Sequence, residues 1–164
     1  MATAQKPDLS MEETLARMVG EWQLPLLLGS EDLAKDAVQE TFLKVYRGLP
    51  SFRGECSEKT WLMRIAVNVC RDMLRSSWFR TIDRRVSLEQ LPEPVFHPVE
   101  EDQFLMESIL TLPLKQREVV LLYYYHNMTL KEIAGALNIS QPSVSRRMSC
   151  AKKQLRSLLK EEAL

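Results

Sequence analysis

The sequence lacks several features that would define a function class at once. It has no run of eighteen apolar residues, so no segment is predicted to span a membrane as a helix. Its cysteines, Cys56, Cys70 and Cys150, form no Cys-x-x-Cys pair, which argues against a disulfide framework and a zinc knuckle. The two histidines, His97 and His126, lie far apart in the sequence. We therefore expect no metal ion and no cofactor, and a reducing, cytoplasmic setting.

Charge is balanced in total but unevenly distributed. The chain has 22 basic and 22 acidic residues. Residues 1–85 carry 13 bases and 12 acids (net +1), residues 86–112 carry no base and six acids (net −6), and residues 113–164 carry nine bases and four acids (net +5). No acid lies between Glu132 and Glu161, where six bases occur. Such a one-sign stretch can be a solvated helix face, or it can contact nucleic acid phosphates.

A proline-containing segment divides the sequence into two helical parts. Residues 87–102, SLEQLPEPVFHPVEED, contain three prolines, no base and no helical period. Since proline fixes φ and disfavours helix in the preceding residue, this segment is predicted to be an extended linker. With no strand pattern elsewhere, we expect an all-α fold of two small helical domains. The predicted boundaries are 1–85 and 103–164 for the domains and 86–102 for the acidic linker.

Two long helices are predicted in the first domain. One begins at Glu31 behind the capping residue Ser30, and the other follows Ser57. The predicted buried face of the first helix comprises Leu33, Ala34, Ala37, Val38, Thr41, Phe42, Val45, Tyr46 and Leu49. The predicted buried face of the second comprises Trp61, Leu62, Ile65, Ala66, Val69, Met73 and Leu74.

The second domain is predicted to contain four helices. The first spans Phe104 to Thr111, and Pro113 suits the first turn of the next, LKQREVVLLYYYHN. Thr129 and Glu132 form a capping box for a third helix near Leu130, whose buried residues are expected to be Ile133, Ala134 and Leu137. Ser140 then caps the last helix, with Val144, Met148, Ala151, Leu155 and Leu158 buried.

The stretch LKEIAGALNISQPSVSRRM has the spacing of a helix-turn-helix. A helix of about two turns is followed by the turn Asn138-Ile139-Ser140 and a longer helix. The exposed face near the start of that longer helix is predicted to carry Gln141, Ser143, Ser145, Arg146 and Ser149, with Arg147 at its flank. Short hydroxyl side chains allow close approach to base edges, and arginine can form two hydrogen bonds to guanine. The alternative at this point is a helical hairpin with a basic, solvated face.

Two blocks of sequence resemble a known family. Residues 32–75 resemble the second conserved region of bacterial RNA polymerase sigma factors, and residues 110–155 resemble their fourth region. Within the sigma-70 family the match is to the small extracytoplasmic-function (ECF) type. The resemblance implies a transcription initiation factor, not an enzyme, that binds RNA polymerase core, recognises two elements of promoter DNA and opens the duplex. Control by an anti-sigma factor is common in the family and is expected here.

The resemblance also implies roles for particular residues. The polymerase-binding face would be formed by Asp36, Gln39, Glu40, Leu43 and Arg47. The single-stranded minus-ten element would be held by Phe52 and Asn68 on a base and by Arg53, Lys59, Arg64, Arg71 and Arg75 on phosphates. The minus-thirty-five element would be recognised by Ser143, Ser145, Arg146, Arg147 and Ser149, with Lys152 and Lys153 on the DNA backbone.

Three departures from the family pattern affect these expectations. Pro142 stands where many relatives have glycine, and Cys150 where many have a base, so the preferred DNA sequence is open. The segment before Asp32 is shorter than in relatives, which would weaken packing of the first helix. The main alternative function is a free-standing helix-turn-helix regulator that dimerises on a palindromic site. That alternative leaves the helices before Trp78 without a role.

Overall fold

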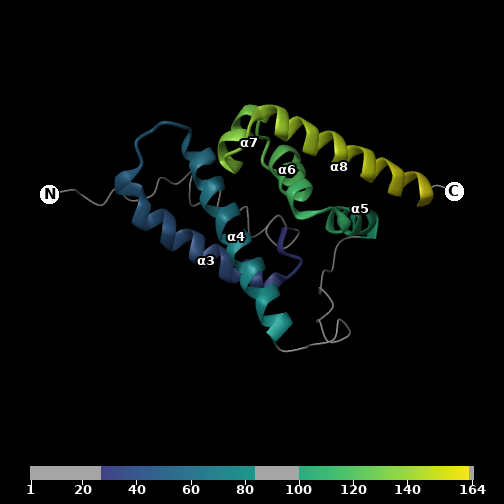
Figure 1. Cartoon of the computed structure of the whole chain (residues 1–164), viewed down its shortest axis with the longest axis horizontal. Helices are drawn as coiled ribbons and strands as arrows, with labels where there is room; N and C mark the ends of the chain where they lie inside the picture. The colour runs from purple at the N-terminus through teal and green to yellow at the C-terminus, as the bar shows by residue number, and fades with distance from the viewer. Residues whose placement is uncertain (1–26, 84–99, 163–164) are drawn as a thin grey trace. The chain divides into compact units, whose positions relative to one another are not determined.

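A computed structural model of the 164-residue chain describes residues 27–83 and 100–162 (Figure 1). The chain divides into two compact units, Met1–Phe96 and His97–Leu164. All regular structure in the described ranges is helical, which confirms the predicted fold class. None of these helices combines the length and apolar character that a membrane span requires. Most of the N-terminal segment that is expected to be shorter than in relatives, and most of the predicted linker, lie outside the described residues.

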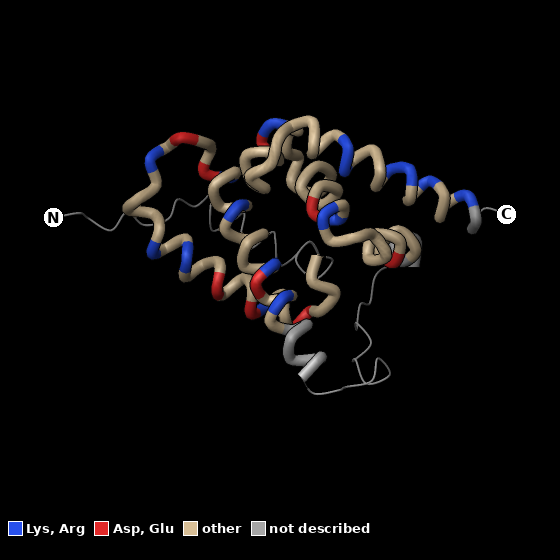
Figure 2. Tube along the Cα trace, viewed as in Figure 1, with Lys and Arg blue, Asp and Glu red and all other residues tan. Residues whose placement is uncertain are grey.

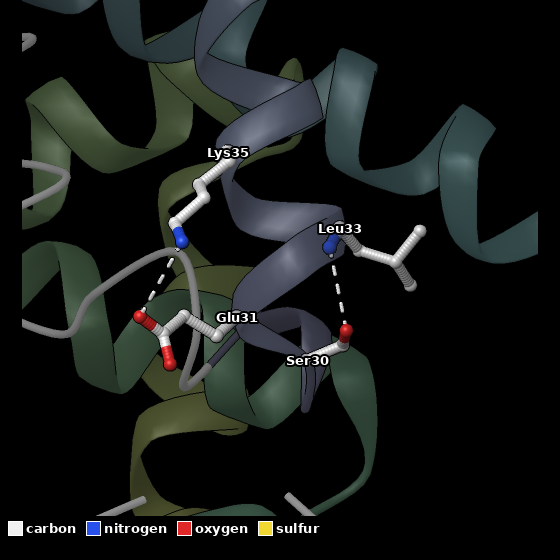
Figure 3. A network of polar contacts seen from close by, with 4 residues as sticks. All are labelled: Ser30, Glu31, Leu33 and Lys35. Carbon is white, nitrogen blue, oxygen red and sulfur yellow. Dashed lines mark hydrogen bonds and ion pairs between the residues drawn. The ribbon is translucent and has the colours of Figure 1, made fainter. Parts of the chain in front are cut away.

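The first unit is built on a pair of helices, α3 (Glu31–Gly48) and α4 (Glu58–Asp83), with the short 3-10 helix η1 (Leu49–Ser51) after α3. Ser30 has extended backbone, and its hydroxyl accepts a hydrogen bond from the Leu33 N–H at 3.3 Å (Figure 3). Glu31 and Lys35 form an exposed ion pair at 3.8 Å on the same turn, a contact of small energetic weight. Ser57 caps α4 by accepting from the Thr60 N–H at 3.1 Å. Both predicted helix starts are therefore confirmed.

The α3 side of its contact with α4 is a narrow strip of small and medium side chains. On α3 it consists of Ala34, Ala37, Thr41 and Val45, and on α4 the buried residues are Thr60, Leu62, Met63, Ala66, Val67, Val69 and Cys70. The prediction that Phe42 and Tyr46 are buried is wrong: they are 40% and 54% exposed. A strip this narrow takes only the residues spaced three and four apart along its centre, and both aromatics lie beside it. Trp61, also predicted as core, is half-buried.

The second unit contains α5 (Glu100–Thr111), α6 (Leu114–Tyr124), α7 (Leu130–Leu137) and α8 (Gln141–Glu162). Helix α5 begins four residues before the predicted Phe104 and so includes the end of the predicted linker. Pro113 is the N-terminal cap of α6 and not its first helical residue. The Arg117 guanidinium donates to the carbonyl oxygens of Leu110 and Leu112 at 3.2 and 3.1 Å, which fixes the α5–α6 connection. Burial lowers the pKa of Arg117, and the nearby Glu118 charge opposes that effect.

The α7–turn–α8 segment matches the predicted helix-turn-helix. Thr129 and Glu132 form the full capping box. The Glu132 N–H donates to the Thr129 hydroxyl oxygen at 3.2 Å, and the Thr129 N–H donates to the Glu132 carboxylate at 2.8 Å. Helix α7 ends at Leu137 and is capped by Asn138, which has a φ of 54° in the left-handed region that asparagine tolerates. Ile133 and Leu137 are buried as predicted, and so are Val144, Met148 and Ala151. Ala136 is buried in place of the half-buried Ala134, and Leu155 and Leu158 are half-buried.

Candidate nucleic-acid interface

The start of α8 presents a hydroxyl-rich face backed by a fully packed one. Ser140 caps the helix by accepting from the Ser143 N–H at 3.3 Å, and the two hydroxyls are 2.8 Å apart. Arg146 and Ser149 are exposed, whereas Ser143, Ser145 and Arg147 are half-buried. Because Val144, Met148 and Ala151 are buried on the opposite side, α8 has only one face available to DNA.

The two adjacent arginines of α8 differ in their surroundings. Arg146 is exposed, and its Nη2 lies 3.4 Å from the Ser143 hydroxyl oxygen, to which it donates. Arg147 is half-buried, and its Nη1 is buried without a hydrogen-bond partner in the described ranges. Arg146 is therefore better placed than Arg147 to reach a base edge, in agreement with the predicted position of Arg147 at the flank of this face.

A basic surface continues along the rest of α8. Ser149, Lys152, Lys153, Arg156, Ser157 and Lys160 line an open depression of about 510 Å³. Lys152 is half-buried, and the other three basic side chains, Lys153, Arg156 and Lys160, are exposed. Figure 2 shows basic positions recurring along α8 with no acidic position among them. This surface suits a phosphate backbone.

In the first unit, the predicted minus-ten residues of α4 form one stripe. Arg64, Asn68, Arg71 and Arg75 are spaced at four, three and four residues, so they share a face, and that face is opposite the buried one. Asn68 and Arg75 are exposed, and Arg75 forms a weak exposed ion pair with Asp72 at 3.9 Å. Lys59, also predicted to hold phosphate, lies in the first turn and on the other side of the helix from this stripe.

The loop between η1 and α4 carries Phe52 and Arg53. Arg53 is exposed, and Phe52 is half-buried with its ring centroid 4.9 Å from that of Trp61. The family resemblance implies that Phe52 faces a base, whereas without the resemblance a loop phenylalanine would be expected to pack on the core. The structure shows that it contacts Trp61 and keeps part of its surface exposed.

Of the predicted polymerase-binding residues, Gln39, Leu43 and Arg47 lie on the side of α3 opposite its buried strip. Asp36 and Glu40 line a depression that α3 shares with α4. Asp36, Gln39, Leu43 and Arg47 are exposed and Glu40 is half-buried. Leu43 is 46% exposed, and the unexpectedly exposed Phe42 and Tyr46 lie on the neighbouring part of the same helix surface. An exposed apolar cluster of this kind typically marks a protein interface.

One feature of the second unit was missed by the sequence reasoning. Between α5, α6 and α8 lies an apolar groove of about 420 Å³, lined by Leu105, Ile109, Val120, Tyr124, Tyr125, Lys152, Leu155, Arg156 and Leu159. Periodicity alone could not locate it, because each of its walls comes from a different helix. Within residues 27–83 and 100–162, no group of histidine, cysteine and acidic side chains could hold a metal ion.

Comparison with known families accounts for both units. The model of sigma-70 region 2 matches residues 15–80, and the model of sigma-70 region 4 matches residues 105–155. The ECF RNA polymerase sigma factor SigW of Bacillus subtilis is 30% identical over 149 residues, covering 82% of this chain and 80% of SigW. This chain is an ECF sigma factor. It is therefore a transcription initiation factor and not an enzyme, and a free-standing regulator would not need region 2.

Other relatives and solved structures agree with this assignment. The ECF sigma-E factor of Salmonella typhimurium is 30% identical over 73% of this sigma factor and 70% of its own length. The chain named "Probable RNA polymerase sigma factor RfaY" in Xanthomonas campestris is also 30% identical, but this chain spans only 34% of its length.

Two solved complexes have the same fold. RpoE in complex with the anti-sigma factor NepR from Bartonella quintana superposes with a TM-score of 0.75 at 23% identity, over 92% of this chain and 97% of that one. CnrH in complex with the cytosolic domain of CnrY superposes with a TM-score of 0.66 at 27% identity, over 93% and 88%.

Proposed function

We propose that this sigma factor binds RNA polymerase core in the cytoplasm and directs it to promoters that have minus-ten and minus-thirty-five elements. The observation that carries the proposal is the pairing, in one chain, of a region 4 reading helix with a region 2 helix stripe. Each has polar or basic groups on the face opposite its buried residues. Strand opening in this scheme uses binding energy alone and requires no nucleotide hydrolysis.

In the second unit, the start of α8 enters the major groove at the minus-thirty-five element. Ser143, Ser145 and Ser149 allow close approach, and Arg146 contacts a base edge. Arg147 lies at the flank of this face, where it supports the contact or reaches a phosphate. Lys152 and Lys153, about one turn further along the helix, contact the DNA backbone. The capped N-terminus of α8 also favours a phosphate group.

In the first unit, the loop and α4 hold the opened minus-ten strand. Phe52 provides an aromatic face on which an unpaired base stacks, and the exposed Asn68 amide pairs with a base edge. Arg53, Arg64, Arg71 and Arg75 hold phosphates on the same strand. Lys59 is the least favoured of the predicted phosphate contacts, because it lies on a different side of α4 from the stripe of Arg64, Asn68, Arg71 and Arg75.

The outward face of α3 binds the polymerase core. Asp36, Gln39, Glu40 and Arg47 supply polar contacts around Leu43, and the exposed Phe42 and Tyr46 enlarge the apolar centre of this surface. Interfaces of this composition, with aromatic residues at the centre and charged residues at the rim, are usual for stable protein complexes.

An anti-sigma factor is the proposed regulator, and the apolar groove of the second unit is its proposed docking site. Two neighbours of this fold were solved with bound proteins, and one of those proteins is named an anti-sigma factor. The groove is lined mainly by apolar side chains and by two basic ones, Lys152 and Arg156. It therefore fits an amphipathic helix with acidic flanks.

Transcription in vitro on a genomic promoter library tests the function. Core polymerase mixed with this sigma factor should initiate at a defined set of promoters, and core alone should not. The sigma factor alone should show no tight, sequence-specific binding to duplex promoters. Tight specific binding by the free protein, with no effect on transcription by core, would contradict the proposal.

A further inference from the structure

Trp61 lies near the start of α4. Its backbone N–H donates to the Ser57 carbonyl at 3.0 Å, so its backbone is fixed within the first turn of α4. It lies three residues before Arg64 and seven before Asn68, on the outward face of α4 and not on the buried one. The ring is nevertheless half-buried, because it folds against the end of α3.

The indole packs directly on backbone at Gly48. A Cβ atom added at Gly48 would lie 3.2 Å from Cζ2 and 3.7 Å from Cη2 of Trp61. Because glycine has no side chain, the ring can lie against the backbone there. Any larger residue at this position would displace the ring by a few tenths of an ångström or more.

The chain after Gly48 then returns Phe52 to the same ring. Ser51 donates its hydroxyl to the Gly48 carbonyl at 2.8 Å, and the Phe52 N–H donates to the Leu49 carbonyl at 3.2 Å. The Phe52 and Trp61 rings are 4.9 Å apart at an interplanar angle of 33°. The indole of Trp61 therefore contacts both the backbone at Gly48 and the phenyl ring of Phe52.

We propose that Trp61 is a positioning residue that holds Phe52 in the orientation needed to capture an unpaired minus-ten base. This inference rests on the proposed role of Phe52. A loop phenylalanine without a neighbour would rotate about its side-chain bonds, and ordering it would cost binding energy. With its side chain held against the indole, Phe52 is fixed before the base arrives.

The test uses holoenzyme assembled with core polymerase and a promoter whose minus-ten segment is pre-melted by mismatches. A 2-aminopurine at the captured position reports base capture by fluorescence. Phe52→Ala should weaken capture by about tenfold or more. Trp61→Leu fills apolar space without offering an aromatic face and should reproduce most of that loss. Trp61→Phe should retain most of the capture, and Gly48→Ala should give a smaller loss than Trp61→Leu.

The double variant decides whether the two rings act as a unit. If Trp61 acts through Phe52, Phe52→Ala with Trp61→Leu should lose little more than Phe52→Ala alone. Leu74→Ala is the matched packing control, since Leu74 is half-buried on the same helix roughly 20 Å from Trp61. It should lower the unfolding temperature of the first unit and leave capture unchanged.

Two results separate the failure of this inference from that of the proposed function. If Phe52→Ala captures the base as well as wild type, the minus-ten role of Phe52 is wrong, and the role of Trp61 falls with it. If Phe52→Ala loses capture but Trp61→Leu does not, or if the two losses multiply in the double variant, Phe52 keeps its role and the positioning role of Trp61 is overturned.

Discussion

The two units present their surfaces in different ways. In the second unit the proposed DNA-reading face belongs to one helix, α8, whose opposite side is buried through Val144, Met148 and Ala151. In the first unit the proposed minus-ten surface combines a loop with a helix, and its aromatic part depends on contacts between the end of α3 and the start of α4. A surface on one periodic helix follows from sequence spacing, whereas a surface assembled from several segments depends on packing.

The exposed apolar residues of the two units show the reverse arrangement. In the second unit, Leu105, Tyr124 and Leu159 are partly exposed along a groove between helices. In the first unit, Phe42, Leu43 and Tyr46 are exposed on a single convex helix, α3. A groove suits a partner helix that inserts into it, and a convex helix suits a partner that offers a concavity or a helix pair.

The largest expected effect concerns core binding by the first unit. Leu43→Glu places a charge at the centre of the proposed polymerase interface and should weaken core binding by about 2 kcal/mol or more, about thirtyfold. A competition assay against labelled wild-type sigma factor measures this change. Lys35→Ala on the same helix, which loses only an exposed ion pair with Glu31, should stay within about twofold. Equal core affinity of wild type and Leu43→Glu would place the docking surface elsewhere.

The second prediction concerns strand opening, which we propose for the first unit only. Phe52→Ala and Asn68→Ala should each cost about 1–3 kcal/mol in open-complex formation, and less in initial binding, because both groups act on a base outside the stack. Transcription from paired and pre-melted templates, run side by side, separates the two steps. Both variants should stay impaired on the pre-melted template, since they grip the base itself. If both variants had wild-type activity on both templates, Phe52 and Asn68 would have a structural role and no role in capturing a base.

The third prediction contrasts two basic residues of α8 in the second unit. Arg146→Ala should cost about 1–3 kcal/mol and relax specificity at one base pair of the minus-thirty-five element. Lys153→Ala should weaken binding to all DNA sequences alike. It should also reduce the magnitude of the slope of log binding constant against log salt concentration by about 0.9. Binding of holoenzyme to duplex variants at several salt concentrations distinguishes the two outcomes. If Arg147→Ala alone relaxes specificity, the half-buried arginine is the one that contacts the base.

The smallest expected effects concern the helix caps. Thr129→Ala removes the hydroxyl of a reciprocal capping box in the second unit, and Ser30→Ala removes a single bond of 3.3 Å in the first. We expect a loss of about 1 kcal/mol in the free energy of unfolding for Thr129→Ala and about 0.5 for Ser30→Ala. Denaturant unfolding followed by circular dichroism measures both. A larger loss for Ser30→Ala would mean that α3 depends more on its cap than α7 does.

The sequence alone determined the features that rest on local geometry. Ser30, Ser57, Thr129 with Glu132, and Ser140 marked helix starts because a side-chain oxygen must accept from the first free N–H groups. The buried side of α8 followed from its spacing, and so did the family, because two blocks of sequence occurred in the expected order.

Tertiary structure decided the features that depend on how widely two helices touch. Periodicity predicts which side of a helix faces inward but not how much of that side a neighbour covers. The narrow α3–α4 contact therefore left Phe42 and Tyr46 exposed. The indole of Trp61 is half-buried because Gly48, thirteen positions earlier, has no side chain, and the sequence around Trp61 carries no trace of that contact. The burial of Arg147 Nη1 and the groove between α5, α6 and α8 arise in the same way, from neighbours that only the folded chain brings together.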